Sequence, residues 1–331
     1  MLLPRPRGPL SNHVVAALLR EESDQSDVAL GHEPVVTDAD AQLALWILYE
    51  LHYRGFDDVV GDREWDTSLI KVRRRLETCF ERELREASAP MLGTTNGPRE
   101  VGDAILELVA SAEGPPLARF LQREADEDQL RDYLKQRSLQ QLKESDPQAF
   151  VVPRLGGAAK VALAELQYDE FGGGRPERLH QSLYAEALEG AGLDPTYGAY
   201  VDEVSALSLA NANVMSMFAL NRRLRGAALG HFAAFEASSS VPSRKVATGI
   251  ERLGLPAAVA AYFHEHVEAD AVHEQVAARD MCGALVADEP DLLDDVLFGA
   301  AACLHLDALS AADLLKRWSA DDDGPELDVA S

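Results

Sequence analysis

The sequence predicts an all-α protein, and three features of the chain support this fold class. Apolar residues recur at helical intervals in many segments, as Leu76, Phe80 and Leu84 do within 68–87. Strand-like alternation is nearly absent, and the only candidate strand is the short segment 150–153. Apolar residues make up 47% of the 331 residues, which is enough for a buried core and excludes a wholly disordered chain.

The boundaries of the expected helices follow from caps and helix breakers. The first long helix begins after Asp38, a good N-cap residue, and runs toward Gly55. The helix over 158–170 ends at the segment 171–176, FGGGRP, because three glycines and a proline do not fit inside a regular helix. Further helices are expected over 14–19, 68–87, 101–112, 198–220, 222–238, 243–253, 256–280, 290–303 and 309–318, and from Glu177 onward.

Length and composition predict how the chain is organised. At roughly 150 residues per domain, the length suggests about two domains or one domain with an extension. We expect an irregular lead-in over 1–38, a helical N-terminal extension over 39–135, a helical core over 136–320 and a disordered acidic tail over 321–331.

The charge of the chain excludes several classes of partner. Against 56 acidic residues there are 31 Lys and Arg, giving a formal net charge of −25, which argues against nucleic acid and anionic membrane surfaces. No apolar run is long enough for a transmembrane helix, and the first residues lack the apolar core of a signal peptide. Three widely spaced cysteines exclude a disulfide framework and a thiolate zinc site. We therefore expect a cytoplasmic protein with no nucleic-acid or membrane partner.

The segment most informative about chemistry is 262–274, YFHEHVEADAVHE. His266, Asp270 and His273 lie at i, i+4 and i+7, so they share one face of a helix, as the ligands of a metal site in a helical bundle do. The zinc-protease pattern HExxH is absent. The alternative is a polar stripe on the surface, which the apolar neighbours Phe263 and Val267 make less favourable.

One helix cannot complete such a site, and carboxylates elsewhere in the chain are candidates. Glu236 follows a segment of small and apolar residues, where an unpaired buried charge would be costly. Glu170 and His180 flank the glycine run, and Glu165 and Asp169 lie close before it. Carboxylates and imidazoles in equal number are typical of a non-haem iron or manganese pair.

Six of these candidate residues follow the pattern of a known family. They are Glu170, His180, Glu236, His266, Asp270 and His273. Their order and spacing resemble those of the metal ligands in the haem-oxygenase-like diiron oxidases. The segment 169–180, DEFGGGRPERLH, resembles the DEYGGG…H segment of the actinobacterial branch called iron-containing redox enzymes, except that Phe171 replaces tyrosine. Segments 46–56, 221–236 and 265–274 resemble three further blocks of that branch, so the resemblance covers about 40–320.

This resemblance implies a fold, a cofactor and a class of reaction. It implies a haem-oxygenase-like helical bundle in which those six residues bind two Fe(II) ions, with manganese as the alternative metal. It also implies dioxygen as co-substrate and an external reductant. Glu165, Asp169 or Glu144 would serve where family members recruit an extra carboxylate. The implied reaction begins with hydrogen abstraction and ends in desaturation, cyclisation, fragmentation or N-oxygenation of a small molecule, with a free amino acid favoured, in a biosynthetic pathway.

Sequence signals for the substrate are weaker. Arg222 or Arg225 could bind a carboxylate, although a surface cluster or inter-helix ion pairs are the favoured explanation of these arginines. Glu50 and His52 could line an entrance, or they could form a hydrogen-bonded pair in the core. The partners expected are a small-molecule substrate and, at most, a second copy of the chain. Three rival functions are a non-catalytic helical binding or scaffold protein, a haem-binding relative and a metal-dependent hydrolase.

Overall fold

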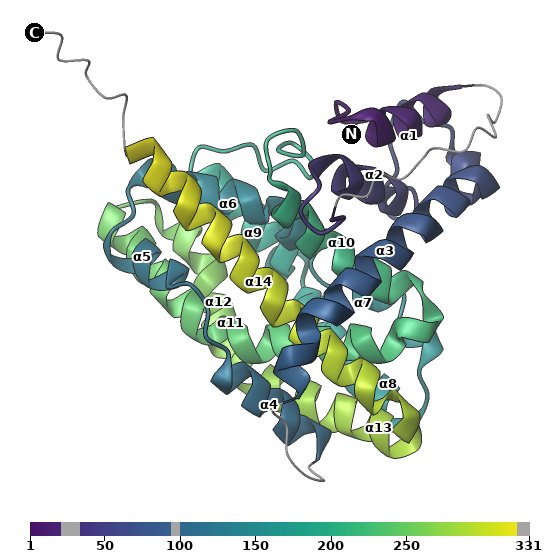
Figure 1. The fold of residues 1–331 in the computed structure, drawn as a ribbon. Coiled ribbons are helices and arrows are strands. Elements are labelled where there is room, and N and C mark those ends of the chain that lie inside the picture. Colours follow the sequence, from purple (N-terminus) through teal and green to yellow (C-terminus); the bar gives the residue numbers. More distant parts are fainter. Residues whose placement is uncertain (21–33, 94–99, 323–331) are drawn as a thin grey trace, which may run out of the picture.

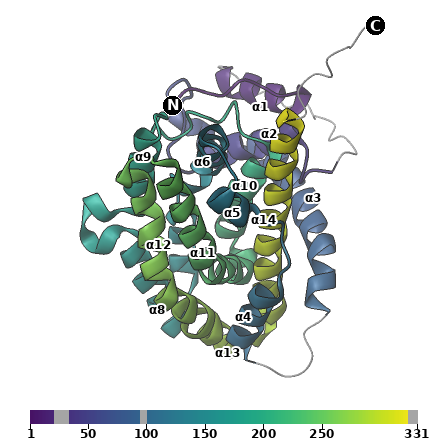
Figure 2. The same cartoon turned by 90° about the vertical axis from the view of Figure 1, so that its left-hand side faces the viewer.

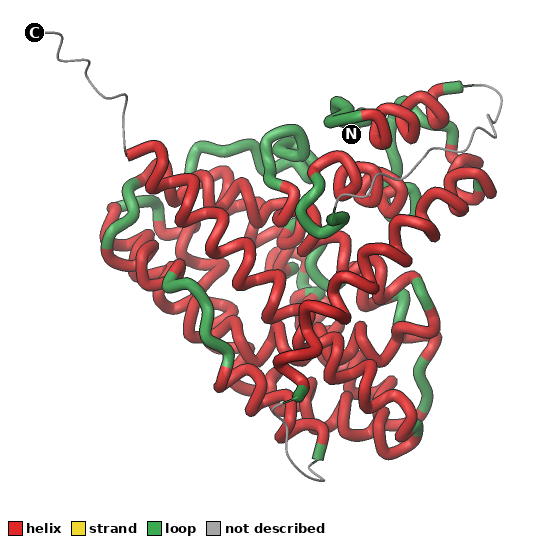
Figure 3. The backbone as a smooth tube through the Cα atoms, viewed as in Figure 1, coloured by secondary structure: helices red, strands yellow, loops and turns green. Residues whose placement is uncertain are grey.

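The structure is a computed structural model that describes residues 1–20, 34–93 and 100–322. Helices joined by short loops and turns make up these residues, and none of the described residues forms a strand (Figure 3). The predicted all-α class is therefore confirmed. The candidate strand at 150–153 instead lies in a turn that includes the 3-10 helix Val152–Arg154.

The N-terminal part contributes five helices. They are α1 (Pro9–Leu19), α2 (Ala39–Glu50), α3 (Thr67–Leu92), α4 (Val101–Ser111) and α5 (Leu117–Arg123). Asp38 caps α2 as predicted, accepting a hydrogen bond from the backbone N–H of Asp40. The lead-in, expected to be irregular apart from 14–19, carries all of α1, because the Asp40 carboxylate accepts from the N–H groups of Leu10 and Ser11 and so caps that helix.

The rest of the chain forms the bundle that holds the candidate site. Its helices are α6 (Glu127–Gln141), α7 (Asp146–Ala149), α8 (Gly157–Glu170), α9 (His180–Gly190), α10 (Ala206–Leu220), α11 (Arg225–Leu253), α12 (Ala257–Gln275), α13 (Ala284–Asp288) and α14 (Leu293–Asp322). The long helices α11, α12 and α14 lie side by side through the molecule (Figures 1 and 2), and α11 contacts both of the others. A π-helical stretch, Val276–Gly283, joins α12 to α13.

Two pairs of expected helices are each continuous in the structure. The helices expected over 222–238 and 243–253 form the single helix α11, which passes through Pro242. Those expected over 290–303 and 309–318 form α14, because the intervening residues include neither glycine nor proline. The helix expected from residue 198 begins only at Ala206, where Ser205 caps it, and α2 ends at Glu50 rather than near Gly55.

The close approach of α11 and α14 depends on two glycines. A Cβ atom at Gly230 would overlap the backbone carbonyl of Val296, and one at Gly299 would overlap that of Ala227. Such an approach brings the two helix backbones into contact, and it buries the segment that leads to Glu236.

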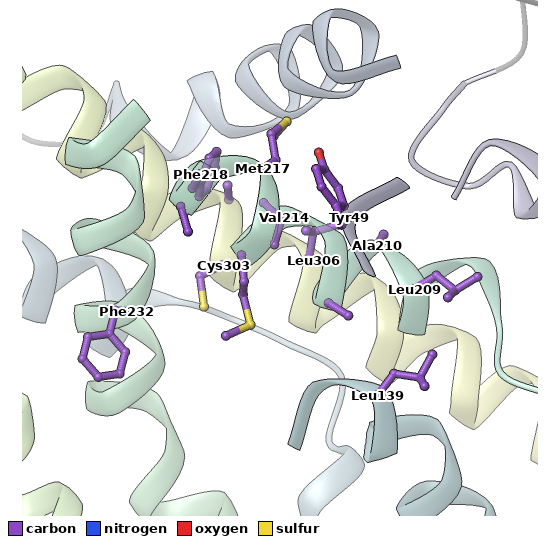
Figure 4. Packing of buried hydrophobic residues seen from close by; sticks show 14 of the residues in the cluster. Tyr49, Leu139, Leu209, Ala210, Val214, Met217, Phe218, Phe232, Cys303 and Leu306 are labelled. Atoms are coloured by element: carbon purple, nitrogen blue, oxygen red, sulfur yellow. The ribbon is translucent and has the colours of Figure 1, made fainter. Parts of the chain in front are cut away.

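The hydrophobic core is continuous from the N-terminal helices into the bundle. Tyr49 of α2 lies near Val214 of α10 in Figure 4, and both belong to one cluster of buried residues with Leu306 of α14. The predicted boundary between 135 and 136 falls within α6, so the expected extension and core share a helix. Helix α14 continues to Asp322, and the rest of the expected acidic tail lies outside the described residues. Within the described part of the chain, every helix is too short or too polar to cross a bilayer.

Candidate metal centre

Two groups of buried acidic and histidine side chains lie next to each other in the bundle. The first group consists of Glu144, His180 and His266, and the second of Glu170, Glu236 and His273. Within each group, one potential ligand atom per residue lies within 4.8 Å of the others. All six side chains are buried. This is the donor set that suits iron or manganese, so the residues fit the metal that the sequence resemblance implies.

In the first group, the imidazoles face one carboxylate oxygen. Glu144 Oε2 lies 3.5 Å from His266 Nε2 and 4.0 Å from His180 Nδ1. The Nδ1–H of His266 donates to the backbone carbonyl of Tyr262 at 2.8 Å, which leaves Nε2 to face the site. The Tyr262 hydroxyl donates to Glu144 Oε2 at 3.0 Å and so restrains the carboxylate.

In the second group, His273 faces two carboxylates with its Nδ1 atom. That atom lies 3.4 Å from Glu236 Oε2 and 3.7 Å from Glu170 Oε1. On the other side of the ring, Nε2 lies 3.3 Å from Asp169 Oδ2. A carboxylate behind a histidine fixes the ring and raises its basicity as a ligand, so Asp169 orients His273 from outside the group.

Glu170 connects the two groups. Its Oε1 atom faces His273, whereas its Oε2 atom lies 3.0 Å from His180 Nδ1 and accepts a hydrogen bond from Ser145 Oγ at 3.1 Å. With one oxygen toward each group, this carboxylate could contribute a ligand atom to a cation in either group.

The glycine run explains how one short segment supplies a residue to each group, Glu170 to the second and His180 to the first. Helix α8 ends at Glu170, and the next turn has positive φ at Gly172, Gly173 and Gly174. A Cβ atom at Gly172 would lie 2.7 Å from the backbone of Arg178 and Leu179, so only glycine permits this turn. The tight reversal returns the chain so that α9 begins at His180, opposite Glu170.

The carboxylates of the site favour the protonated form of the neighbouring imidazoles. Burial lowers the pKa of His273, but Glu236 and Glu170 outweigh burial and raise that pKa to about 9. Burial likewise opposes the charge of His180, yet Glu170 raises its pKa, and the histidines in turn hold the pKa of Glu170 below its usual value. Metal ions would displace these protons, since imidazole binds a metal in its neutral form.

A cavity of about 180 Å³ adjoins the first group. Tyr262 and His266 form part of its wall, and His231 contributes a buried neutral imidazole whose pKa burial lowers to about 4. Helices α6, α10, α11, α12 and α14 supply most of the remaining wall. At roughly 10–15 Å³ per water-sized unit, this volume suits a molecule of about ten or more non-hydrogen atoms.

The structure brings together five of the six predicted ligands. These are Glu170, His180, Glu236, His266 and His273. The backbone of Asp270 belongs to α12, but its side chain lies outside the described residues. Of the three extra carboxylates considered, Glu144 joins the first group and Asp169 contacts His273, whereas Glu165 is exposed and belongs to neither group. No local sequence signal singles out Glu144, which follows one of the most highly charged segments of the chain.

The four residues suggested for substrate binding lie outside the cavity wall. Arg222 is exposed, and Arg225 pairs with Glu289. Glu50 is fully buried and forms an ion pair with Lys143. The His52 ring contacts Glu64, with 3.1 Å between Nδ1 and Oε1.

Comparison with known proteins agrees with this geometry. Residues 131–308, more than half of the chain, match the model of the family described as iron-containing redox enzymes. Two crystal structures of a CADD-like protein of unknown function from Nostoc punctiforme, at 2.00 and 1.35 Å resolution, resemble this chain with a TM-score of 0.52 and 16% identity. The first match covers 66% of this chain and 96% of the Nostoc chain, and the second 68% and 97%. At this identity the likeness shows the fold alone, and no curated protein matches. The chain therefore belongs to the family of iron-containing redox enzymes and has their haem-oxygenase-like helical fold.

Proposed function

We propose that the protein is an oxygen-dependent, non-haem diiron oxidase or oxygenase that acts on a small molecule, with a free amino acid as the favoured substrate class. One observation carries the proposal: Glu170 contacts a histidine of each of two buried carboxylate–histidine groups, and His266 of the first group forms part of a cavity wall. The family to which the chain belongs supports redox chemistry with iron.

Each part of the site has a role in this proposal. Bound iron would supply the redox chemistry with dioxygen. An external reductant would supply the electrons that restore the iron to the Fe(II) state. Glu144, His180 and His266 would hold the ion nearer the cavity. Tyr262 holds Glu144 in place through its hydroxyl and packs edge-on against Tyr184, with ring centroids 4.7 Å apart.

The second group would hold the other ion. Glu170, Glu236 and His273 supply its donor atoms, and Asp169 keeps the imidazole of His273 in its orientation. The proposed reaction is abstraction of hydrogen from the substrate followed by desaturation, cyclisation, fragmentation or N-oxygenation, as a step in a biosynthetic pathway.

The experiment that tests the proposal is dioxygen consumption by anaerobically Fe(II)-loaded protein, measured with an oxygen electrode. Wild type and His266→Ala are compared with His264→Ala, a matched control on the same helix whose side chain is 54% exposed. We expect rapid, iron-dependent oxygen uptake by wild type and the control, and a loss of at least tenfold in His266→Ala.

Three results would contradict the proposal. Equal oxygen uptake by His266→Ala and wild type would mean that iron reacts elsewhere. Failure of wild type to bind iron would favour a helical binding or scaffold protein, and turnover of a substrate without dioxygen would favour a metal-dependent hydrolase.

A further inference from the structure

The cavity beside the first group carries two opposite charges on its wall. Arg137 of α6 donates from Nη1 to Asp307 Oδ1 of α14 at 3.1 Å. The Arg137 side chain is only 19% exposed, whereas that of Asp307 is 65% exposed. The arginine therefore lies in the wall as a largely desolvated cation, and the aspartate lies toward solvent with much of its carboxylate accessible.

Two polar atoms on this wall lack hydrogen-bond partners among the described residues. They are Nε of Arg137 and Oε1 of Gln141, and both atoms are buried. The two residues are one turn apart on α6, so their side chains share a face and are separated by about 6 Å along the helix. A buried donor or acceptor without a partner is destabilising, so a ligand whose polar groups pair with this wall would gain free energy there.

The wall pattern specifies what such a ligand carries. A guanidinium with an unpaired N–H favours a carboxylate, and an accessible aspartate favours an ammonium group. Since Arg137 and Asp307 together have no net charge, a ligand with one group of each sign leaves the cavity neutral. A free α-amino acid carries both groups on one carbon, and its size fits the cavity of about 180 Å³.

We propose that Arg137 and Asp307 are the specificity residues of this cavity, with Arg137 binding the carboxylate of a free amino acid and Asp307 binding its ammonium group. The assignment deepens the proposed function, since it names the residues that select the substrate class. It replaces Arg222 and Arg225, which lie outside the cavity wall.

The test is ligand binding by isothermal titration calorimetry with the full-length chain, under argon, with and without Fe(II). The probes are the twenty proteinogenic L-amino acids. For the tightest binder, two matched probes follow: the carboxylic acid that lacks the α-amino group and the amine that lacks the carboxylate. We expect saturable binding of at least one amino acid and binding at least tenfold weaker for both matched probes.

Variants then assign each half of the head group. Arg137→Met is expected to weaken the amino acid and the carboxylic acid by tenfold or more, since each loses a charge-assisted pair. Asp307→Asn, a change at an exposed side chain, is expected to weaken the amino acid and the amine while leaving the carboxylic acid unchanged. Arg222→Met is the matched control and should bind like wild type. Should Arg137→Met fail to fold by circular dichroism, Asp307→Asn still decides.

The proposal is overturned if none of the twenty amino acids binds at 10 mM or if Asp307→Asn binds them as wild type does. Binding of the carboxylic acid as tightly as the amino acid would overturn the role of Asp307. Because binding is measured in the absence of iron as well, amino-acid recognition without iron binding would refute the proposed function and leave this assignment standing.

Discussion

Replacing Lys143 by methionine is expected to lower the free energy of unfolding by about 3–5 kcal/mol, the usual cost of breaking a buried ion pair from one side. The side chains of Lys143 and Glu50 are 2% and 0% exposed, and the ammonium group contacts the carboxylate directly. The substitution would leave Glu50 with the hydroxyl of Tyr197, 2.6 Å from Oε1, while Oε2 has no partner among the described residues.

The size of the effect follows from this environment. The ammonium group also lies 4.2 Å from the ring centroid of Tyr53, and this cation–π contact is lost in the variant. Methionine fills part of the space of the lysine side chain, so the loss of stability is mainly electrostatic. In the double variant Glu50→Gln/Lys143→Met no buried charge is left unpaired, so most of the loss should be recovered.

The assay is equilibrium urea unfolding of metal-free protein, followed by circular dichroism at 222 nm. Lys71→Met, at an exposed position of α3, is the control and should change the free energy of unfolding by no more than about 0.5 kcal/mol. The reasoning is refuted if Lys143→Met costs less than about 1 kcal/mol, or if the double variant is less stable than the single one.

Three further predictions concern packing, protonation and metal affinity. Gly230→Ala should lower the free energy of unfolding by at least about 1–3 kcal/mol in the same urea assay, because its Cβ would overlap the carbonyl of Val296; a change under 0.5 kcal/mol would contradict the close contact. Burial lowers the pKa of His231 to about 4, so the unfolded chain takes up a proton there first as the pH falls below about 6.5. The neutral form therefore contributes stability that is complete above that pH, and about 2 kcal/mol of it should be lost between pH 7.5 and pH 5 in wild type but not in His231→Phe; parallel pH profiles would refute this. Asp169→Asn should weaken Fe(II) binding about tenfold, measured by anaerobic competition with a chelator, whereas Glu165→Gln on the same helix should not; equal affinities would remove Asp169 from its orienting role.

The sequence predicted the parts of the fold that depend on local signals. Periodicity placed the starts of α2, α3, α4 and α8 within one residue of the observed ones, and the cap Asp38 marked the start of α2. It did not predict that α11 continues through Pro242, because the packing of α11 between α12 and α14 outweighs one missing backbone hydrogen bond.

The sequence could predict those residues of the candidate site that share one helix or lie on either side of a helix break. His266 and His273 lie on one face of α12, and the glycine run marks Glu170 and His180. Glu144 follows a highly charged helix, and only the tertiary fold shows that it is buried beside His266. Arg137 was missed for the same reason, since it lies in the highly charged segment 123–146, and such a segment is typical of a solvated helix face.

The measurement that tests the central claim most directly is an anaerobic Fe(II) titration of wild type, His266→Ala and His273→Ala, with bound iron determined by chelator absorbance after gel filtration. Each variant removes one imidazole from a different group. The two-group site predicts about two irons per chain for wild type and about one for each variant. A wild type that retains less than one iron, or variants that both bind as much iron as wild type, would contradict it.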